Sequence, residues 1–462
     1  MPRNKAYRNR ILFNACLATS LVPFMGSSIN LALPQIAREF SMSGIVQSWT
    51  VTSYLLLTAI LQVPFGRLAD IWGKRTVFLT GLSVFLVTTV CCGFASNSMI
   101  FIILRSLQGV GSAMVFCSNI AIISSVFPPK ERGTAMGINA ATVYISIAAG
   151  PSLGGFITQN LGWEYIFFFT AAISALALTG SLIVMKENWI ESKGEPFDLK
   201  GSIIYGLAIT ALIYGLTILP RLTGFLLIIG STGLLFLFVK QEGKVKYPVF
   251  HISLLVENKT FRRASITALI NYASTFPIGF LISLYLQEVK TLDAQSAGMI
   301  LIVQPVVQTV LSPIAGKLSD KILPRYLSLS GMAIISVVLF AIALLLKPDS
   351  TTTLIIVMLS LLGIGFAVFS SPNTNAIMGS VDKKHYSMAS ATTGTVRLIG
   401  QAFSMGITTM IISIIIGNQA ITPEVSAQLM QVIHITFILF AVLSATGAYI
   451  LSTRDKRPTE KA

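Results

Sequence analysis

The sequence predicts an all-α polytopic membrane protein whose chain crosses a lipid bilayer fourteen times. Only 11% of its 462 residues are charged and 53% are hydrophobic, with a mean hydropathy of +0.77. A soluble surface needs roughly a quarter of its residues charged. Apolar runs of about 20 residues, enough to span a bilayer as a helix, recur along the chain, and the loops between them alternate between rich and poor in Lys and Arg.

The spans follow in order from these apolar runs. An even number of spans puts both termini on one side of the membrane. We divide the chain into an N-terminal six-helix half (residues 1–189), two additional central helices (190–245) and a C-terminal six-helix half (246–462). At a length of about 20 residues each, the predicted spans lie at about 12–33, 46–65, 76–96, 99–123, 134–157, 164–185, 200–219, 222–239, 264–286, 296–315, 327–346, 353–377, 388–416 and 430–452.

The distribution of cations predicts which side faces the cytoplasm. Lys and Arg concentrate in cytoplasmic loops, and the N-terminus is basic, so we place both termini inside a prokaryotic inner (plasma) membrane. Of the 33 Lys and Arg residues, the outside loops then carry only Arg38, Arg221, Lys290 and Lys347, and two more, Arg105 and Arg397, lie within spans. The net charge of +15 therefore suits the anionic inner leaflet. No nucleic-acid partner is expected, because the cations are scattered among short loops.

The sequence offers no sign of enzyme or metal chemistry. The four cysteines, Cys16, Cys91, Cys92 and Cys117, lie in apolar runs without metal-ligand spacing, which is typical of packing residues. The chain contains no GxxxxGK[ST], HExxH or GxSxG motif. We therefore expect neither an enzyme nor a metal site.

The chain repeats itself. "FGRLAD" at residues 65–70 matches "AGKLSD" at 315–320, an offset of 250, and "GVGSA" at 109–113 matches "GIGFA" at 363–367. The second offset, 254, also relates Asn119 to Asn373. Two homologous six-span halves are a common transporter plan, with the substrate site between them near mid-membrane.

Six motifs in order make the chain resemble the major facilitator superfamily over essentially its whole length, and specifically its fourteen-span drug:proton antiporter branch. They are "INLALPQI" (29–36), "GRLADIWGKR" (66–75), "LRSLQGVGSA" (104–113), "AAGPSLGG" (148–155), "LGWEYIFF" (161–168, with Glu164 where an arginine is usual) and "LYLQEVKTLDAQSAG" (284–298). The resemblance implies a secondary active, multidrug-efflux-like antiporter that works by rocking its two halves. It also implies an ion gradient, expected to be of protons, as the energy source, with no cofactor.

The loop 66–75 is predicted to be a gating latch at the cytoplasmic end. Gly66 and Gly73 allow a tight turn and close helix approach. Asp70 can accept hydrogen bonds from the N-terminus of a neighbouring span or pair with Arg75, which would favour the outward-facing state. Alternatively, the cations only set topology. The matching loop of the second half keeps Asp320 but ends in "ILPR" (322–325), so we expect its latch to be degenerate.

The "GPSLGG" stretch at residues 150–155 resembles the antiporter motif of the family's fifth span. Gly150 and Gly154 share one face of a helix, Gly155 is adjacent, and small residues let membrane helices pack closely. Pro151 permits a bend. The resemblance implies export, with the motif sealing the closed side against leak; plain helix packing is compatible with the same pattern.

The spans contain arginines but no carboxylates. A cation at the membrane centre costs about 2.5–3.5 kcal/mol on insertion scales, so Arg105 and Arg397 should face the cavity or bond to backbone carbonyls. Met25 occupies the position where the family commonly has an aspartate. The candidates for protonation are Glu288, at the outer end of the ninth span, and His434, although a lone histidine on an apolar helix is more often a hydrogen-bonded packing residue.

Amides in the spans are candidates for a polar cavity lining, although each could instead bond across helices. They are Asn30, Asn119, Asn139, Asn271, Gln304, Gln308, Asn373 and Gln401.

The sequence favours an exporter of amphipathic small molecules by rocker-switch alternating access, with the lipid bilayer and its substrate as partners, acting as a monomer. The alternative is a dedicated exporter of an anionic or lipid-like metabolite with a different coupling mechanism. A non-transporting receptor or scaffold on this fold is a further class. With two arginines and no acid in the spans, a positive cleft should favour neutral or anionic substrates over lipophilic cations.

Overall fold

The computed structural model describes residues 5–250, 256–319, 321–381 and 386–453, except for some side chains near residues 130 and 388. The predicted Asp320 lies outside these residues. Fourteen helical stretches in the described part are long and apolar enough to cross a membrane, and no strand occurs there. The predicted fold class is therefore confirmed.

Most of the helices are longer than the predicted spans because they continue into the polar residues at both membrane surfaces; the third, sixth and seventh are not. Helix α1 has 35 residues, or about 52 Å at 1.5 Å per residue, against a hydrocarbon core of about 30 Å. The N-terminal half contains α1 (Lys5–Glu39), α2 (Gly44–Trp72), α3 (Lys74–Gly93), α4 (Ser98–Val126), α5 (Pro129–Asn160) and α6 (Glu164–Val184).

The central pair and the C-terminal half follow the same plan with more interruptions. The central pair is α7 (Leu199–Thr217) and α8 (Leu222–Glu242). The ninth span is broken into α10 (Lys259–Thr275), α11 (Pro277–Leu284) and the π-helical turn η1 (Tyr285–Val289), and the tenth into α12 (Ala294–Leu301) and α13 (Val303–Leu318). The last four spans are α14 (Pro324–Leu345), α15 (Thr352–Gly379), α16 (Tyr386–Ile415) and α17 (Ser426–Ser452), the last preceded by the short 3₁₀ turn η3 (Pro423–Val425).

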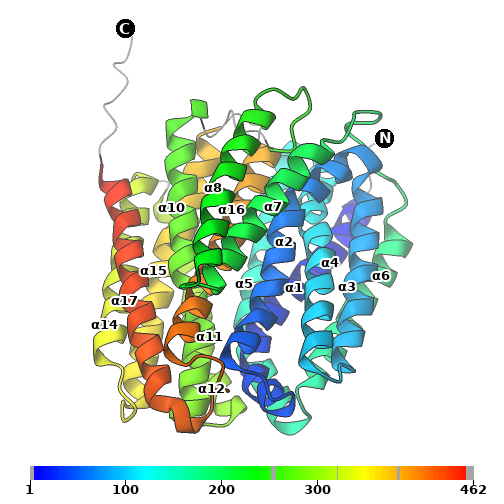
Figure 1. The fold of residues 1–462 in the computed structure, drawn as a ribbon. Coiled ribbons are helices and arrows are strands. Elements are labelled where there is room, and N and C mark those ends of the chain that lie inside the picture. Colours follow the sequence, from blue (N-terminus) through cyan, green and yellow to red (C-terminus); the bar gives the residue numbers. More distant parts are fainter. Residues whose placement is uncertain (1–4, 251–255, 320, 382–385, 454–462) are drawn as a thin grey trace.

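The two halves stand side by side, with the central pair between them at one face (Figure 1). Helix α7 packs against α8 and also touches α2 of one half and α16 of the other. Helix α1 begins and helix α17 ends at the same end of the bundle. We call this the basic end, because the loops richest in Lys and Arg lie there, and we call the other the opposite end.

The sequence repeat recurs as the same close approach of helices in each half. A Cβ at Gly109 in α4 would lie 2.5 Å from the Tyr54 carbonyl oxygen, and one at Gly363 in α15 would lie 2.6 Å from the Gln304 carbonyl oxygen. The two glycines are 254 residues apart and the two carbonyls 250 apart, the offsets of the sequence motifs. Backbones at such distances leave no room for a side chain, so glycine is required at both positions. The boundaries of the three predicted segments stay predictions.

The topology is testable with reporter fusions. Green fluorescent protein fused after Ala462 should fluoresce and alkaline phosphatase fused there should be inactive, because basic loops stay in the cytoplasm. A phosphatase fusion that truncates the chain after Asn97, at the opposite end, should be active and serves as the control. Phosphatase activity after Ala462 would place the basic end outside and contradict the topology.

Candidate functional site

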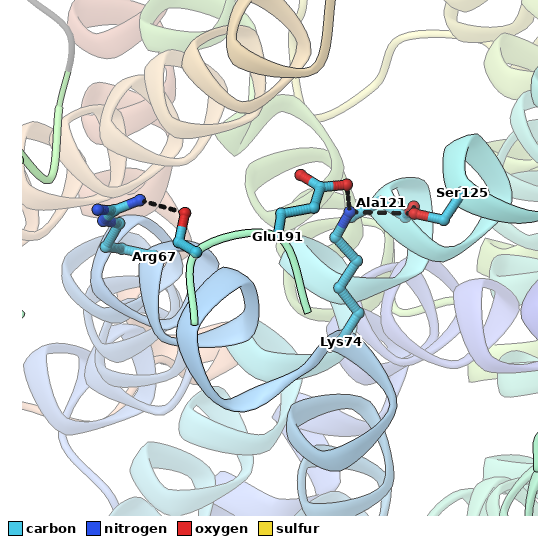
Figure 2. A network of polar contacts seen from close by, with 6 residues as sticks. Arg67, Lys74, Ala121, Ser125 and Glu191 are labelled. Carbon is cyan, nitrogen blue, oxygen red and sulfur yellow. Dashed lines mark hydrogen bonds and ion pairs between the residues drawn. The ribbon is translucent and has the colours of Figure 1, made fainter. Parts of the chain in front are cut away.

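Residues 66–75, predicted as a loop, are helical except for Gly73, because they form the end of α2 and the start of α3; we keep the name loop 66–75 for them. Their cations bind the segment that follows α6. This segment, residues 185–198, has no helix and is called here the linker. Arg67 donates to the Ser192 hydroxyl at 3.1 Å and pairs with Glu195. Lys74, almost fully buried, donates to the Ser125 hydroxyl at 3.0 Å and pairs with Glu191 (Figure 2). The loop therefore fastens the N-terminal half to the segment that leads into α7.

The predicted pairing of Asp70 with Arg75 is not present in this structure. Arg75 donates from Nε to the carbonyl oxygen of Met185 at the end of α6, where a cation is favoured by the helix dipole. Among the described residues, the Asp70 carboxylate has no hydrogen bond, although it lies within the field of Lys74, Glu191 and Arg67. Its backbone carbonyl accepts from the amides of Glu191 and Ser192.

The predicted turn at Gly73 is glycine-specific for two reasons. Gly73 separates α2 from α3 with φ +101°, a conformation that other residues rarely adopt. The Asn188 side chain also fills the space where a Cβ would stand, and it donates to the Trp72 carbonyl at 3.0 Å. Gly66 has an ordinary contact with Cys117 instead, at 3.7 Å from its Cβ position.

The second half has an arginine contact that matches the one of Arg75. The expectation that its latch is degenerate stays a prediction, because Asp320 lies outside the described residues. Arg325, the last residue of "ILPR" and 250 positions after Arg75, donates from Nε to the Leu451 carbonyl. It also donates to the carbonyls of Ser452 and Thr453, both at 2.7 Å. Proline before the arginine begins α14 at its first turn, which is a favourable position for proline, and leaves the guanidinium free to cap α17.

At the opposite end, the antiporter-like motif packs on two different helices. Cβ atoms at Gly150 and Gly154 would overlap Ser27 and Ser28 of α1, and the Ser28 hydroxyl donates to the Gly150 carbonyl at 3.0 Å. Gly155 instead faces the other half, where its Cβ would overlap the Ala294 carbonyl at the start of α12. The motif is thus both an internal packing surface and part of the contact between the halves.

Pro151 completes that contact. A Cβ on Gly298 of α12 would overlap the carbonyl oxygen of Pro151. The backbones of α5 and α12 are therefore in direct contact at two places, where Gly155 packs on Ala294 and Gly298 packs on Pro151. Such a fit excludes water and side chains between α5 and α12.

Polar contacts between the halves lie at the same end. Arg38, in the last turn of α1, donates to Glu288 of η1 at 2.6 Å. The Ser283 hydroxyl donates to the Asn30 carbonyl at 2.7 Å, Gly44 N–H donates to the Gln419 carbonyl at 2.8 Å, and the Thr409 hydroxyl donates to that of Ser48 at 2.9 Å. These contacts join α1 and α2 of the N-terminal half to the ninth and thirteenth spans and to the loop after the thirteenth. The opposite end is therefore closed.

Arg105 lies inside the N-terminal half and not between the halves. Its side chain is fully buried, donates from Nε to the Thr50 carbonyl at 3.3 Å and from Nη1 to Gln108, and stacks 4.4 Å over the Tyr54 ring. Gln108 in turn donates to the Thr89 hydroxyl at 2.7 Å. The carbonyl-bonded alternative thus describes Arg105, which ties α2, α3 and α4 together.

Arg397 lies between the halves, half-buried on α16. Its guanidinium stands 5.3 Å from the centre of the Phe116 ring of α4, across the interface. It is also close enough to Tyr272 of α10 for its charge to act on the phenol. The Tyr144 hydroxyl of α5 lies 3.5 Å from the Ser370 hydroxyl of α15, which also faces Tyr272. We call Phe116, Tyr144, Tyr272, Ser370 and Arg397 the central cluster.

Sequence reasoning found only the arginine of this cluster. Aromatic residues are common in any apolar helix, so nothing in the pattern separated Phe116, Tyr144 and Tyr272 from packing residues. The five members come from five helices of both halves. Only the packing of the helices brings them together.

The predicted amides fall into two groups. Asn119 and Asn139 bond to each other at 3.0 Å, and Asn139 accepts from Thr19 at 2.9 Å inside the N-terminal half. Asn373 donates to the Ala264 carbonyl at 3.2 Å and Asn271 to the Met332 sulfur at 3.4 Å, both inside the C-terminal half. These four amides join helices of one half, as the interhelical alternative describes.

The remaining predicted residues are placed differently. Asn30 lies on α1 against Gly279 of α11, and its buried Oδ1 has no partner among the described residues. Gln304 and Gln401 are half-buried, and Gln308 is buried. The His434 Nε2 lies 2.8 Å from the Leu346 carbonyl, which is the arrangement of a packing histidine. No group of three His, Cys, Asp or Glu side chains placed to hold a metal ion occurs in the described part.

Comparison with known proteins now identifies the family. The family model of the Major Facilitator Superfamily matches residues 15–255 and 264–462 of the chain. The chain belongs to this superfamily. It is therefore a membrane transporter and not an enzyme.

Curated relatives and solved structures agree with this assignment. The riboflavin transporter RibZ of Clostridioides difficile is 28% identical over 397 residues, covering 86% of each chain. The multidrug resistance protein Stp of Mycobacterium tuberculosis is 28% identical over 409 residues, which is 86% of this chain and 75% of Stp. A bacterial homologue of the human lysosomal transporter Spinster, solved in an inward-facing and unoccupied conformation, has the same fold with a TM-score of 0.68, 16% identity and 97% coverage of both chains.

Replacement of Asp70 by Asn tests the role of the loop 66–75. We expect normal folding but impaired transport. The Asp70 carboxylate has no hydrogen bond among the described residues in this state, so we expect its charge-assisted contact in the state closed at the basic end. Loss of that contact should shift the equilibrium between the two states by about tenfold or more. Glu257→Gln, an exposed acid also at the basic end, is the control. Transport by Asp70→Asn that matched wild type at all substrate concentrations would make Asp70 a solvated loop charge.

Replacement of Gly155 by Ala tests the closure of the opposite end. The new methyl group would overlap the Ala294 carbonyl, and overpacking of this kind costs about 1–3 kcal/mol, a roughly 5- to 150-fold shift toward the state in which the halves separate there. Labelling of Ser283→Cys, buried between the halves, in a protein whose four free cysteines are replaced by Ser should become faster. Gly137→Ala in the same helix, where a Cβ meets nothing within 4 Å, should change nothing. Equal labelling in both variants would contradict the proposed seal.

Proposed function

We propose that this transporter exports amphipathic small molecules by alternating access, as a monomer driven by a proton gradient. The observation that carries the proposal is the central cluster, a charged and aromatic group that joins both halves at mid-depth. A site shared by two rocking halves is reachable from either side in turn. The antiporter-like motif at the closed end and the similarity to Stp, named as a multidrug resistance protein, support export.

Orientation follows from charge. If the basic end faces the cytoplasm, as the positive-inside rule requires, the closed opposite end faces outward. The structure then corresponds to a state that cannot release substrate outside. Export requires the contacts between α5 and α12, and between Arg38 and Glu288, to break while the basic end closes.

The chemistry of the central cluster favours neutral or anionic aromatic amphiphiles. Phe116, Tyr144 and Tyr272 offer ring faces for stacking. Arg397 offers planar donors that suit a carboxylate or another acceptor group. Among the described residues no carboxylate lies in this cluster to attract a cation.

The alternative is a dedicated exporter of an anionic or lipid-like metabolite. The observation that favours it is Arg397, which would select one acidic group, together with the similarity to a protein named as a riboflavin transporter. The two functions differ in breadth and not in the site used. A panel of toxicants in drug-sensitive cells separates them, because a dedicated exporter protects against few or none.

Arg397→Ala separates substrate binding from packing. Cells that express wild type or variant are compared for resistance to nalidixate (anionic), chloramphenicol (neutral) and methyl viologen (dicationic). A hydrogen bond to a charged group contributes about 1.5–3 kcal/mol, so protection against the anion should fall about 10-fold or more, with little change for the neutral compound. Arg397→Lys should be intermediate for the anion, because it keeps the charge but loses the planar fork.

Two outcomes would contradict this assignment. Equal loss of protection against the anion and the neutral compound would make Arg397 structural. Strong export of methyl viologen independent of Arg397 would refute the charge argument for the central cluster.

A further inference from the structure

Glu288 is one of only two buried carboxylates in the described part of the chain, the other being Glu242 at the end of α8. Glu242 accepts from the Phe250 amide, close by in the chain. Glu288 lies between the two halves. The Arg38 side chain that pairs with it is 59% exposed, whereas the Glu288 side chain is 0% exposed. The pair therefore has one member in water and the other in the protein.

A local distortion of the ninth span presents Glu288 to α1. The turn η1 is π-helical, with the Lys290 amide donating to the Tyr285 carbonyl at 2.9 Å. A π-turn widens the helix by one residue and is often found at functional sites. Glu288 Oε1 accepts from Arg38, while the buried Oε2 has no partner among the described residues. A buried carboxylate oxygen without a donor is costly unless a proton or a water molecule reaches it.

Arg38 and Glu288 occupy equivalent positions in the two repeats. They are 250 residues apart, the offset that relates the loop motifs and the carbonyls of Tyr54 and Gln304. The equivalence extends to the backbone, since Ser41 and Thr291 both have positive φ, +49° and +53°. It extends further to the caps, where Ser43 and Asp293 accept from the amides three residues on.

This equivalence explains why the pair responds to closure. The halves of this fold are related by an axis along the membrane normal. Equivalent residues that touch each other must lie near that axis. When the halves rock apart at the opposite end, Arg38 moves with α1 and Glu288 moves with the ninth span, so the two side chains separate. The pair can exist only in the closed state.

Polar groups continue from Glu288 toward the middle of the membrane. The Gln287 side chain donates to the Ser283 hydroxyl at 3.0 Å, and that hydroxyl donates to the Asn30 carbonyl at 2.7 Å. Asn30 Oδ1 is the second buried acceptor without a partner along this seam between α1 and the ninth span. Asn30 is eight residues before Arg38 on α1, about 12 Å deeper at 1.5 Å per residue.

We propose that Glu288 is the proton-binding group of this transporter and that Arg38 is the cation that displaces the proton. This inference rests on the proposed proton-driven export. When the opposite end opens, Arg38 withdraws and Glu288 takes a proton from the external water. When it closes, Arg38 returns to Oε1, and the proton leaves from the Oε2 side along the seam toward the basic end. One proton moves inward in each cycle.

The other titratable or charged groups near this turn are already engaged. Hydrogen bonds from the Ser296 amide and hydroxyl hold the pKa of Asp293, at the start of α12, below its ordinary value. Four further groups near the turn also have hydrogen bonds. Glu39 of α1 accepts from the Trp163 indole, and His434 of α17 bonds to the Leu346 carbonyl. Lys290 donates to the Ser350 carbonyl, and Tyr285, which is near Asp349, donates to the Lys347 carbonyl. None of these groups has a hydrogen bond or ion pair with the Glu288 carboxylate, whose partner among the described residues is Arg38.

The test measures opening of the opposite end without substrate. Spin labels on Leu161→Cys and Gln419→Cys, in a protein whose native cysteines are replaced, report the distance between the halves in lipid nanodiscs. In wild type, lowering the pH from 8 to 5 should raise the long-distance population, because protonation of the Glu288 carboxylate removes the ion pair with Arg38 that forms only in the closed state. Glu288→Gln should be open at both pH values. Glu424→Gln, an exposed acid at the same end, should behave as wild type.

A charge exchange keeps the test valid if Glu288→Gln folds poorly. Because the two positions are equivalent, Arg38→Glu combined with Glu288→Arg should restore closure at pH 8 and opening at pH 5, whereas either single reversal should stay open. A wild-type distance that ignored pH, or a Glu288→Gln protein with wild-type pH dependence, would overturn the proposal.

Transport in proteoliposomes separates this inference from the proposed function. With chloramphenicol as the probe, wild type should accumulate it when a pH gradient is imposed, and Glu288→Gln should keep exchange without a gradient but lose the gradient-driven accumulation about tenfold. Gradient-driven accumulation that survives in Glu288→Gln overturns the role of Glu288. Absence of gradient-driven transport in wild type, with pH-dependent opening that Glu288→Gln abolishes, instead contradicts proton-driven export and supports Glu288 as the proton-binding group.

Discussion

Several charges of this protein lie where water cannot solvate them fully, and Arg75, Arg105 and Arg325 are each placed by the partners that replace water. An unpaired charge in a low-dielectric interior costs several kcal/mol. Arg105 meets this constraint with a carbonyl, an amide and an aromatic ring. Arg75 and Arg325 meet it with the carbonyls that a helix leaves free at its C-terminus. Because those partners belong to other helices, satisfying the charge also fixes how the helices pack.

The same constraint connects the central helices to the N-terminal half. Arg67 and Lys74 are paired with acids of the linker, which runs directly into α7. Helix α7 touches both α2 and α16, so it lies against each of the two halves that must move relative to one another. The loop 66–75 therefore acts on the position of the central pair as well as on the basic end of the N-terminal half.

At the opposite end the contact between the halves combines close backbone packing with an ion pair. Backbone meets backbone where Gly155 and Gly298 pack on carbonyls of the other half, a fit that is either made or broken. The ion pair of Arg38 with Glu288 lies in the same layer, and its strength depends on one proton. A contact of this kind can be closed tightly and still be released by a change in protonation.

Much of the architecture was determined by the sequence alone. Fourteen spans, two homologous halves and the superfamily follow from the length of apolar runs, the alternation of cations and six ordered motifs, because a bilayer allows few ways to bury a backbone. Only the tertiary structure decided the partners. Arg75 bonds to Met185 and not to Asp70, Asn119 and Asn139 satisfy each other inside one half, and Arg38, predicted as a loop charge, reaches Glu288 of the other half. The physical reason is that helices in lipid are apolar on every side, so their sequence does not reveal which face of a helix is turned toward which neighbour.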